Sequence, residues 1–147
     1  MTTAPDTRTP ADPPPGFQLG VVRGISYGLW AKPDQFVPQA RALGAGLIRA
    51  SVYWSQVEPE PGRYVWDAVD MLLDQCDGEA ELWLTVCSSS LWATRQPTDF
   101  QPQSPAHDLD AYGAFVRGLL RHCGRRVTYW QCNNEPSNTT LWAGTAA

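Results

Sequence analysis

The sequence lacks the features that mark three large classes of protein. It has no cluster of lysine and arginine, its net charge is -4 and its pI is about 5.0, so it offers no basic surface to a nucleic-acid backbone. No apolar run approaches the roughly 20 residues that a membrane-spanning helix needs. The polar, proline-rich N-terminus has neither the basic region nor the apolar region of a signal peptide. We therefore expect no nucleic-acid partner, no membrane partner and a cytoplasmic location.

Common cofactor and metal motifs are also missing. The four cysteines form no CxxC pair, which argues against a zinc site, and we interpret them as small buried apolar residues of a reducing compartment. The glycines near residue 24 lack the spacing of a dinucleotide-binding loop, and no G-x-S-x-G nucleophile motif occurs. We expect neither a metal nor a cofactor.

Short apolar segments alternate with amphipathic ones along the chain. The apolar segments at 21–26, 47–52, 82–86 and 127–132 predict strands. Helical spacing of apolar residues predicts helices over 36–43, 66–76 and 109–120. The order β-α-β-α-β-α-β is typical of a parallel sheet, either open or closed into a barrel.

The absence of a dinucleotide loop favours the barrel. A complete (β/α)8 barrel needs about 250 residues, and this sequence supplies four strands in 147 residues. We therefore predict an α/β protein containing the first four β-α units of a (β/α)8 TIM barrel, truncated after the fourth strand. The domain spans residues 17–147, and residues 1–16 form a disordered, proline-rich leader.

Aromatic residues gather at the predicted carboxyl ends of the strands, where α/β folds carry their chemistry. The sequence has seven tryptophans, an unusual number for this length. Indole faces stack on pyranose rings, and several at one face favour sugar binding over simple core packing. The predicted sugar-binding residues are Trp30, Trp54, Trp92 and Trp142.

The segment Asn134-Glu135-Pro136 follows the fourth predicted strand. A glycosidase acid needs a carboxyl group in a semi-enclosed, partly apolar place, where its pKa is raised. A glutamate at the end of a buried strand, between Trp130 and Trp142, fits that requirement. Asn134 is placed to bond a sugar 2-hydroxyl.

Several motifs together resemble the first half of the clan A glycoside hydrolases, nearest to the β-xylosidase, α-iduronidase-like and cellulase-like branches. The motifs are Ile48-Arg49, then Trp54-x-x-Val57-Glu58-Pro59-x-x-Gly62-x-Tyr64-x-Trp66-Asp67, then Tyr129-Trp130-Gln131-x-x-Asn134-Glu135-Pro136-x-Asn138 and Trp142-x-Gly144-Thr145. The resemblance extends from about residue 21 to residue 145.

The resemblance implies a TIM barrel that hydrolyses a β-linked oligo- or polysaccharide with retention. It implies that Glu135 is the general acid/base, Asn134 its partner at the 2-hydroxyl, and Arg49 the residue that orients the nucleophile. The family's nucleophile is a second glutamate at strand seven, beyond the four strands here, and retention needs two carboxyl groups roughly 5–5.5 Å apart. Glu58 and Glu60 read as part of a turn instead. We therefore expect the chain alone to be inactive, and to pair with a second copy or with a C-terminal half.

Two other interpretations remain. The chain is alternatively a non-catalytic half-barrel that binds carbohydrate through its aromatic residues. The third interpretation is an open-sheet hydrolase, which the missing nucleophile elbow disfavours.

Overall fold

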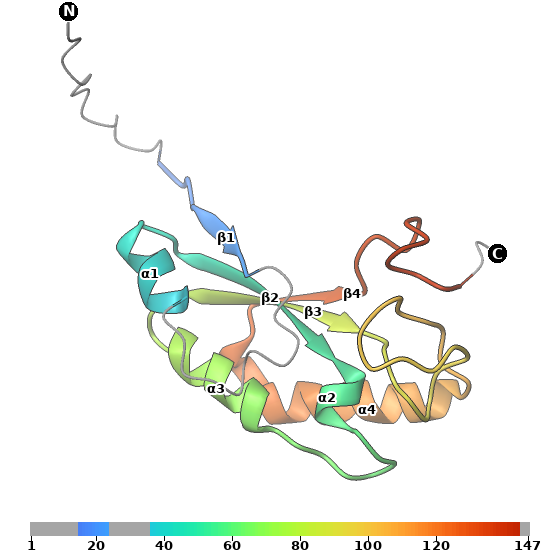
Figure 1. The fold of residues 1–147 in the computed structure, drawn as a ribbon. Helices are drawn as coiled ribbons and strands as arrows, with labels where there is room; N and C mark the ends of the chain where they lie inside the picture. The colour runs from blue at the N-terminus through green and yellow to red at the C-terminus, as the bar shows by residue number, and fades with distance from the viewer. Residues whose placement is uncertain (1–14, 24–35, 145–147) are drawn as a thin grey trace, which may run out of the picture.

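A computed structural model describes residues 15–23 and 36–144, which form a four-stranded sheet packed against helices (Figure 1). The elements in chain order are β1 (Gly20–Val22), α1 (Phe36–Ala42), β2 (Leu47–Tyr53), α2 (Trp54–Val57), α3 (Asp67–Cys76), β3 (Glu81–Cys87), α4 (Leu109–Cys123), the 3-10 turn η1 (Gly124–Arg126) and β4 (Tyr129–Cys132). The strands are parallel and neighbours in the order β1-β2-β3-β4. This sequential β-α arrangement is half of a (β/α)8 barrel, and it confirms the predicted fold class.

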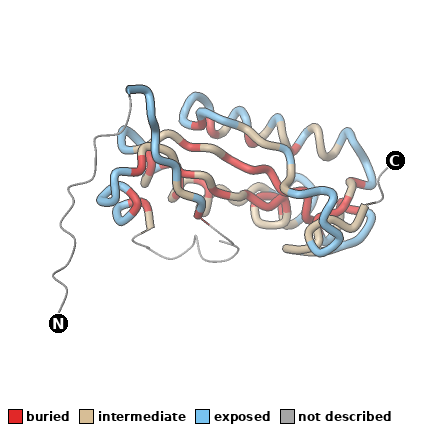
Figure 2. Tube along the Cα trace, turned by 90° about the horizontal axis from the view of Figure 1, so that it is seen from above, coloured by how far each residue is buried: buried red, intermediate tan, exposed pale blue. Residues whose placement is uncertain are grey.

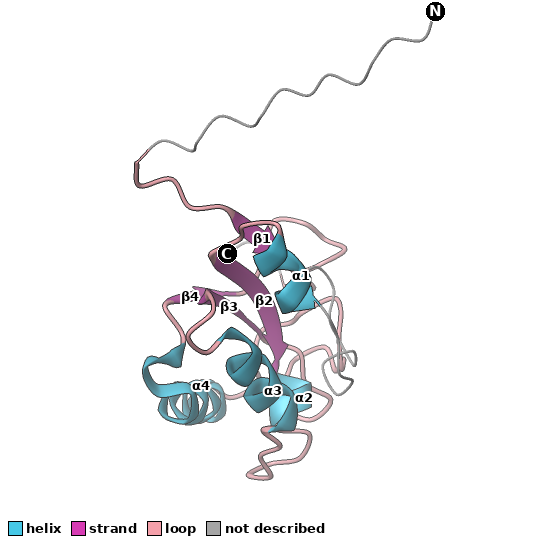
Figure 3. Ribbon diagram, turned by 90° about the vertical axis from the view of Figure 1, so that its left-hand side faces the viewer, coloured by secondary structure: helices cyan, strands magenta, loops and turns pink. Residues whose placement is uncertain are grey.

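The sheet has one covered face and one open face. The helices lie on a single side of the strands (Figures 1 and 3). On β2, Ile48, Ala50 and Val52 are buried, whereas Arg49 and Ser51 between them are only half-buried. Because side chains alternate across a strand, the second set lies on the concave face that a complete barrel would enclose.

The core lies between the sheet and the helices, and Figure 2 shows the buried stretches concentrated there. The predicted apolar face of α3 is confirmed, because Leu72 and Leu73 are buried. On α4 the prediction is confirmed for Phe115 and Leu119, which are buried, and was wrong for Leu109 and Leu120, which are 77% and 42% exposed. The prediction was wrong for Leu43, which is 76% exposed because α1 ends at Ala42 and the chain turns away there.

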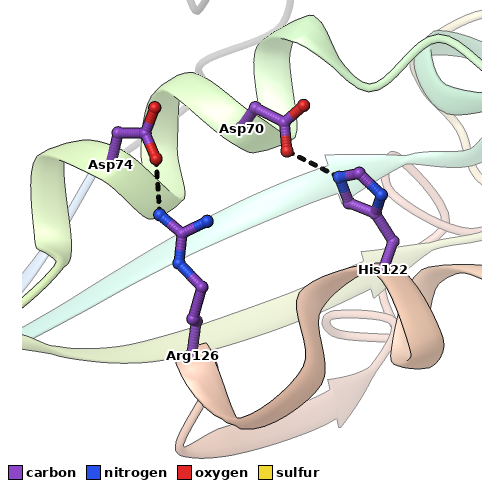
Figure 4. A network of polar contacts seen from close by, with 4 residues as sticks. All are labelled: Asp70, Asp74, His122 and Arg126. Carbon is purple, nitrogen blue, oxygen red and sulfur yellow. Dashed lines mark hydrogen bonds and ion pairs between the residues drawn. The ribbon is translucent and has the colours of Figure 1, made fainter.

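Polar contacts join α3 to α4 on the outer side of the core (Figure 4). His122 bonds Asp70 at 2.6 Å, and Arg126 donates to Asp74 at 2.5 Å. Trp66 stacks on the His122 ring with centroids 4.0 Å apart. These contacts set the position of α4 and the following η1 turn against α3.

Within the described residues the two outer strands each have one neighbour. On the open face, Val22 is 59% exposed and Tyr129 is 45% exposed. Trp83 lies between them on the same face, and its indole nitrogen is buried without a hydrogen-bond partner. A strand edge and an apolar face of this kind favour pairing with another chain.

We therefore expect the 147-residue chain to self-associate, either as aggregates or as a dimer that brings eight strands together. Pairing of β1 with β4 of a second copy would remove both free edges. Light scattering over a range of concentrations measures the mass, and calorimetry measures cooperative unfolding. A monodisperse monomer that unfolds cooperatively would contradict this expectation.

Among the residues described, no helix combines the length and the apolar character required to cross a bilayer.

Candidate active site

Arg49, the third of the seven residues of β2, bonds Asn134, which follows the carboxyl end of β4. Arg49 extends from β2 over the Trp83 ring, with its guanidinium carbon 5.5 Å from the ring centroid. Its Nη2 donates to Asn134 Oδ1 at 2.7 Å, and its Nε donates to Thr85 Oγ1 at 3.3 Å. The structure thus joins two of the predicted site residues that lie 85 positions apart in the sequence.

A cleft of about 210 Å³ opens beside this pair. It is lined by Val22, Arg23, Arg49, Ala50, Ser51, Tyr53, Cys87, Gln101, Gln103, Asn134 and Leu141. The described lining includes two arginines and three side-chain amides, and it includes no carboxylate. The same described residues contain no group of three potential metal ligands. The cleft therefore offers hydrogen-bond donors and positive charge.

Two titratable groups in the cleft stay neutral near pH 7. Burial raises the pKa of Tyr53 to about 12 and that of the Cys87 thiol to about 12. A thiol needs to ionise before it acts as a nucleophile. Neither side chain therefore supplies a base or a nucleophile at neutral pH.

The turn after β4 is held by Asn133. Its Oδ1 accepts hydrogen bonds from the Ser88 backbone N–H at 3.0 Å and from the Ser88 hydroxyl at 3.2 Å. Asn133 and Glu135 both have positive φ, at 54° and 49°. Asparagine adopts this conformation readily, whereas for glutamate it costs about 1–2 kcal/mol. Backbone strain of this kind clusters at functional sites.

Glu135 differs from the sequence-based expectation in its surroundings. The carboxylate is exposed, and Asn138 Nδ2 donates to its Oε2 at 3.3 Å. It follows Asn134 directly but does not line the cleft. The expectation of a buried strand and a semi-enclosed carboxyl was wrong for the described residues, because β4 is an outer strand with exposed or half-buried positions throughout.

The four predicted sugar-binding tryptophans do not share one open face. Trp54 is fully buried and stacks on Phe115 with centroids 5.2 Å apart, so its assignment to the sugar face was wrong. Trp92 packs edge-on against Trp54, and its Nε1 donates to the Glu58 carbonyl at 2.9 Å.

Trp142 is half-buried in the loop after β4, and its indole lies against Gly144, where no other side chain would fit. Trp30 lies outside the described residues.

Glu58 is buried within the turn that its Pro/Gly-rich context predicted. Only 5% of it is exposed. Its Oε2 accepts from Trp54 Nε1 at 2.7 Å, and its Oε1 accepts from the Gly62 N–H at 2.8 Å. The Glu-Pro-x-x-Gly motif forms a turn, and the buried Glu58 carboxylate stabilises this turn by accepting the Gly62 N–H.

Three further residues that line the cleft were not among the predicted site residues. Tyr53 is the last residue of β2, and Gln101 and Gln103 belong to the long loop at 88–107. The length of that loop was the available signal, because long loops in compact domains are often functional. Nothing in the sequence distinguished these two glutamines from other polar loop residues.

The solved structures to which the chain is similar include several glycoside hydrolases. The chain is similar to a family 39 glycoside hydrolase from Bacteroides cellulosilyticus WH2, with a TM-score of 0.60 and 19% identity over 80% of this chain and 24% of that one. It is similar to an exo-β-1,4-mannosidase from Opitutaceae bacterium strain TAV5, with a TM-score of 0.59 and 15% identity over 82% of this chain and 25% of that one. For a β-glucosidase from Exiguobacterium marinum the TM-score is 0.54 and the identity 16%, over 76% of this chain and 25% of that one.

These similarities confirm the expected structural resemblance to clan A barrels. The chain spans about a quarter of the length of the structures it matches. No family profile matches the sequence, and no curated protein matches it by sequence.

Proposed function

We propose that this chain carries the acid/base half of a retaining glycoside hydrolase site for a β-linked oligo- or polysaccharide. The observation that carries the proposal is the 2.7 Å bond from Arg49 to Asn134, in a fold similar to that of glycosidases and directly beside Glu135. Asn134 and Glu135 follow the carboxyl end of β4, and parallel α/β folds hold their reactive groups at the carboxyl ends of strands.

In this proposal Glu135 protonates the glycosidic oxygen and later removes a proton from water. Asn134 Oδ1 accepts a hydrogen bond from Arg49 Nη2, which leaves the side-chain NH2 of Asn134 to donate to the sugar 2-hydroxyl. That bond strengthens as positive charge develops on the ring.

The proposal requires a second carboxylate, and none lines the described cleft. We propose that it comes from strands that complete the barrel, and that the Arg49 guanidinium then orients it. Arg49 suits this task because, within the part of the chain that the structure describes, its guanidinium donates hydrogen bonds to the neutral side chains of Asn134 and Thr85 and to no carboxylate.

The lack of a second carboxylate also favours one alternative, a half-barrel that binds carbohydrate without hydrolysing it. Both functions need sugar to bind at the cleft, and they differ in whether Glu135 acts as an acid. Binding tests the shared premise, and catalysis separates the two.

We expect the Asn134→Ala variant to bind cello- and xylo-oligosaccharides about tenfold more weakly than the unmodified chain, which corresponds to about 1.4 kcal/mol. The substitution removes the amide donor and releases Arg49 from its position. Isothermal titration calorimetry at millimolar sugar measures the change, with Thr139→Ala, an exposed residue of the same loop, as the control. Equal affinity in Asn134→Ala and Thr139→Ala would contradict the proposal, as would a folded parent chain that binds no sugar.

A further inference from the structure

Gln103 lies in the cleft wall with an unused hydrogen-bonding atom. Only 2% of the residue is exposed, and it lines the same cleft as Arg49 and Asn134. Its side-chain Oε1 is buried and has no hydrogen-bond partner among the described residues. An unpaired buried amide oxygen is costly, so native proteins keep few of them and each calls for an explanation.

The backbone around Gln103 holds the residue firmly in place. Its N–H donates to the Leu141 carbonyl at 2.8 Å, and its carbonyl accepts from the Ala143 N–H at 2.7 Å. These two bonds fasten the loop after β3 to the loop that carries Asn134 and Glu135. The amide is thus presented from a fixed backbone, which lowers the entropy cost of binding a ligand.

Gln103 differs in position from the other described side chains with a buried, unpaired polar atom. Those atoms belong to Gln56, Gln75, Trp83 and Tyr112, and none of these residues lines the cleft. Among these described residues, Gln103 is therefore the one whose unpaired polar atom belongs to the lining of the proposed site.

We propose that Gln103 is a ligand-contacting residue, whose side-chain amide bonds a hydroxyl group of a carbohydrate in the cleft. This inference rests on the proposed function and names a contact within it. A hydroxyl both donates and accepts, so it matches an amide whichever way the oxygen and nitrogen are assigned. An anionic group would instead be drawn to Arg49, so the amide selects for a neutral polyhydroxylated part of the ligand.

The test compares Gln103→Leu with the parent chain, using cellobiose and its monodeoxy analogues as probes. Leucine fills a similar volume and removes the polar atoms. We expect Gln103→Leu to bind cellobiose about tenfold more weakly. We also expect its melting temperature to be unchanged or higher, because an unpaired buried group is lost. Gln96→Leu, an exposed glutamine of the same loop, is the matched control and is expected to bind normally.

The deoxy analogues identify the hydroxyl. One deoxy analogue should bind the parent chain more weakly than cellobiose does. The Gln103→Leu variant should bind that analogue as well as it binds cellobiose, because the substitution and the missing hydroxyl remove the same hydrogen bond. Undiminished cellobiose binding by Gln103→Leu would overturn this inference and leave the proposed function standing. Unfolding of Gln103→Leu, seen by circular dichroism, would show that the protein itself uses the amide and would also overturn it. A folded parent chain that binds no sugar would overturn both proposals.

Discussion

Replacing Trp54 with alanine is expected to lower the free energy of unfolding by about 3–5 kcal/mol, the usual cost of removing a large buried aromatic ring. The ring is fully buried, stacks on Phe115 at 5.2 Å and meets Trp92 edge-on at 5.4 Å. The same ring also contacts Tyr112, with centroids 5.4 Å apart. Urea denaturation followed by circular dichroism, at one fixed protein concentration, measures the change.

The matched variant Trp54→Phe separates the ring from its hydrogen bond. Phenylalanine keeps most of the apolar volume but loses the N–H that donates to Glu58 at 2.7 Å. The buried carboxylate then keeps the Gly62 N–H as its remaining hydrogen-bond donor in the structure described. We expect a loss of about 1–3 kcal/mol, smaller than for alanine. A Trp54→Ala variant as stable as the parent would show that the residue lies on an open surface instead.

Much of the fold was predictable because it depends on local periodicity. The apolar spacing of Val69, Leu72, Leu73 and Cys76 recurs at helical intervals, and all four residues are buried. A β-α alternation leaves few topologies, since right-handed crossovers place consecutive strands side by side. The parallel order of the four strands follows from that constraint more than from any single residue.

The direction of individual side chains at the strand ends was not predictable. Tyr53 is the last residue of β2 and lines the cleft, whereas Trp54 begins α2 and enters the core. Two consecutive aromatics thus face opposite ways, because the backbone changes from strand to helix between them. A four-residue helix such as α2 has too few residues to show a periodic pattern in the sequence.

The candidate site was predictable in part, because some of its residues are positioned by the order of the strands and others by the path of a loop. Asn134 follows the end of β4, and Arg49 lies within β2, from which its long side chain reaches Asn134. Gln103 depends instead on the path of a long loop, which is fixed by bonds such as the one to the Leu141 carbonyl. Contacts between two irregular segments leave no repeating signal in the sequence.

The chain is expected to show no significant turnover of aryl β-glycosides by itself, even as a dimer. In a two-fold dimer, β3 of one copy would take the place of the seventh strand of a barrel. That strand ends at Cys87, whose pKa is raised to about 12 by burial, and Ser88 to Ser90 follow it. None of these groups replaces a carboxylate nucleophile near pH 7.

Supplying the missing carboxylate from solution gives the acid role of Glu135 a positive test. Formate can attack the anomeric carbon of phenyl β-cellobioside, while the carbon–oxygen bond to phenol breaks and Glu135 protonates the departing oxygen. The glycosyl formate then reacts with water and releases the sugar and formate. We expect slow turnover of the parent chain in high formate. In Glu135→Gln we expect the rate to fall by at least about 100-fold, because acid catalysis contributes typically 10²–10⁴-fold.

The leaving group decides whether that loss reflects acid catalysis. Phenol is a poor leaving group and needs a proton, whereas dinitrophenol leaves as an anion without one. Glu135→Gln should therefore slow the phenyl glycoside strongly and the dinitrophenyl glycoside little. Glu60→Gln, which changes an exposed glutamate paired with Arg63, serves as the control and should match the parent chain on both. Equal rates for Glu135→Gln and the parent on the phenyl glycoside would leave carbohydrate binding without catalysis as the better account, and robust turnover without formate would reveal a nucleophile within the chain.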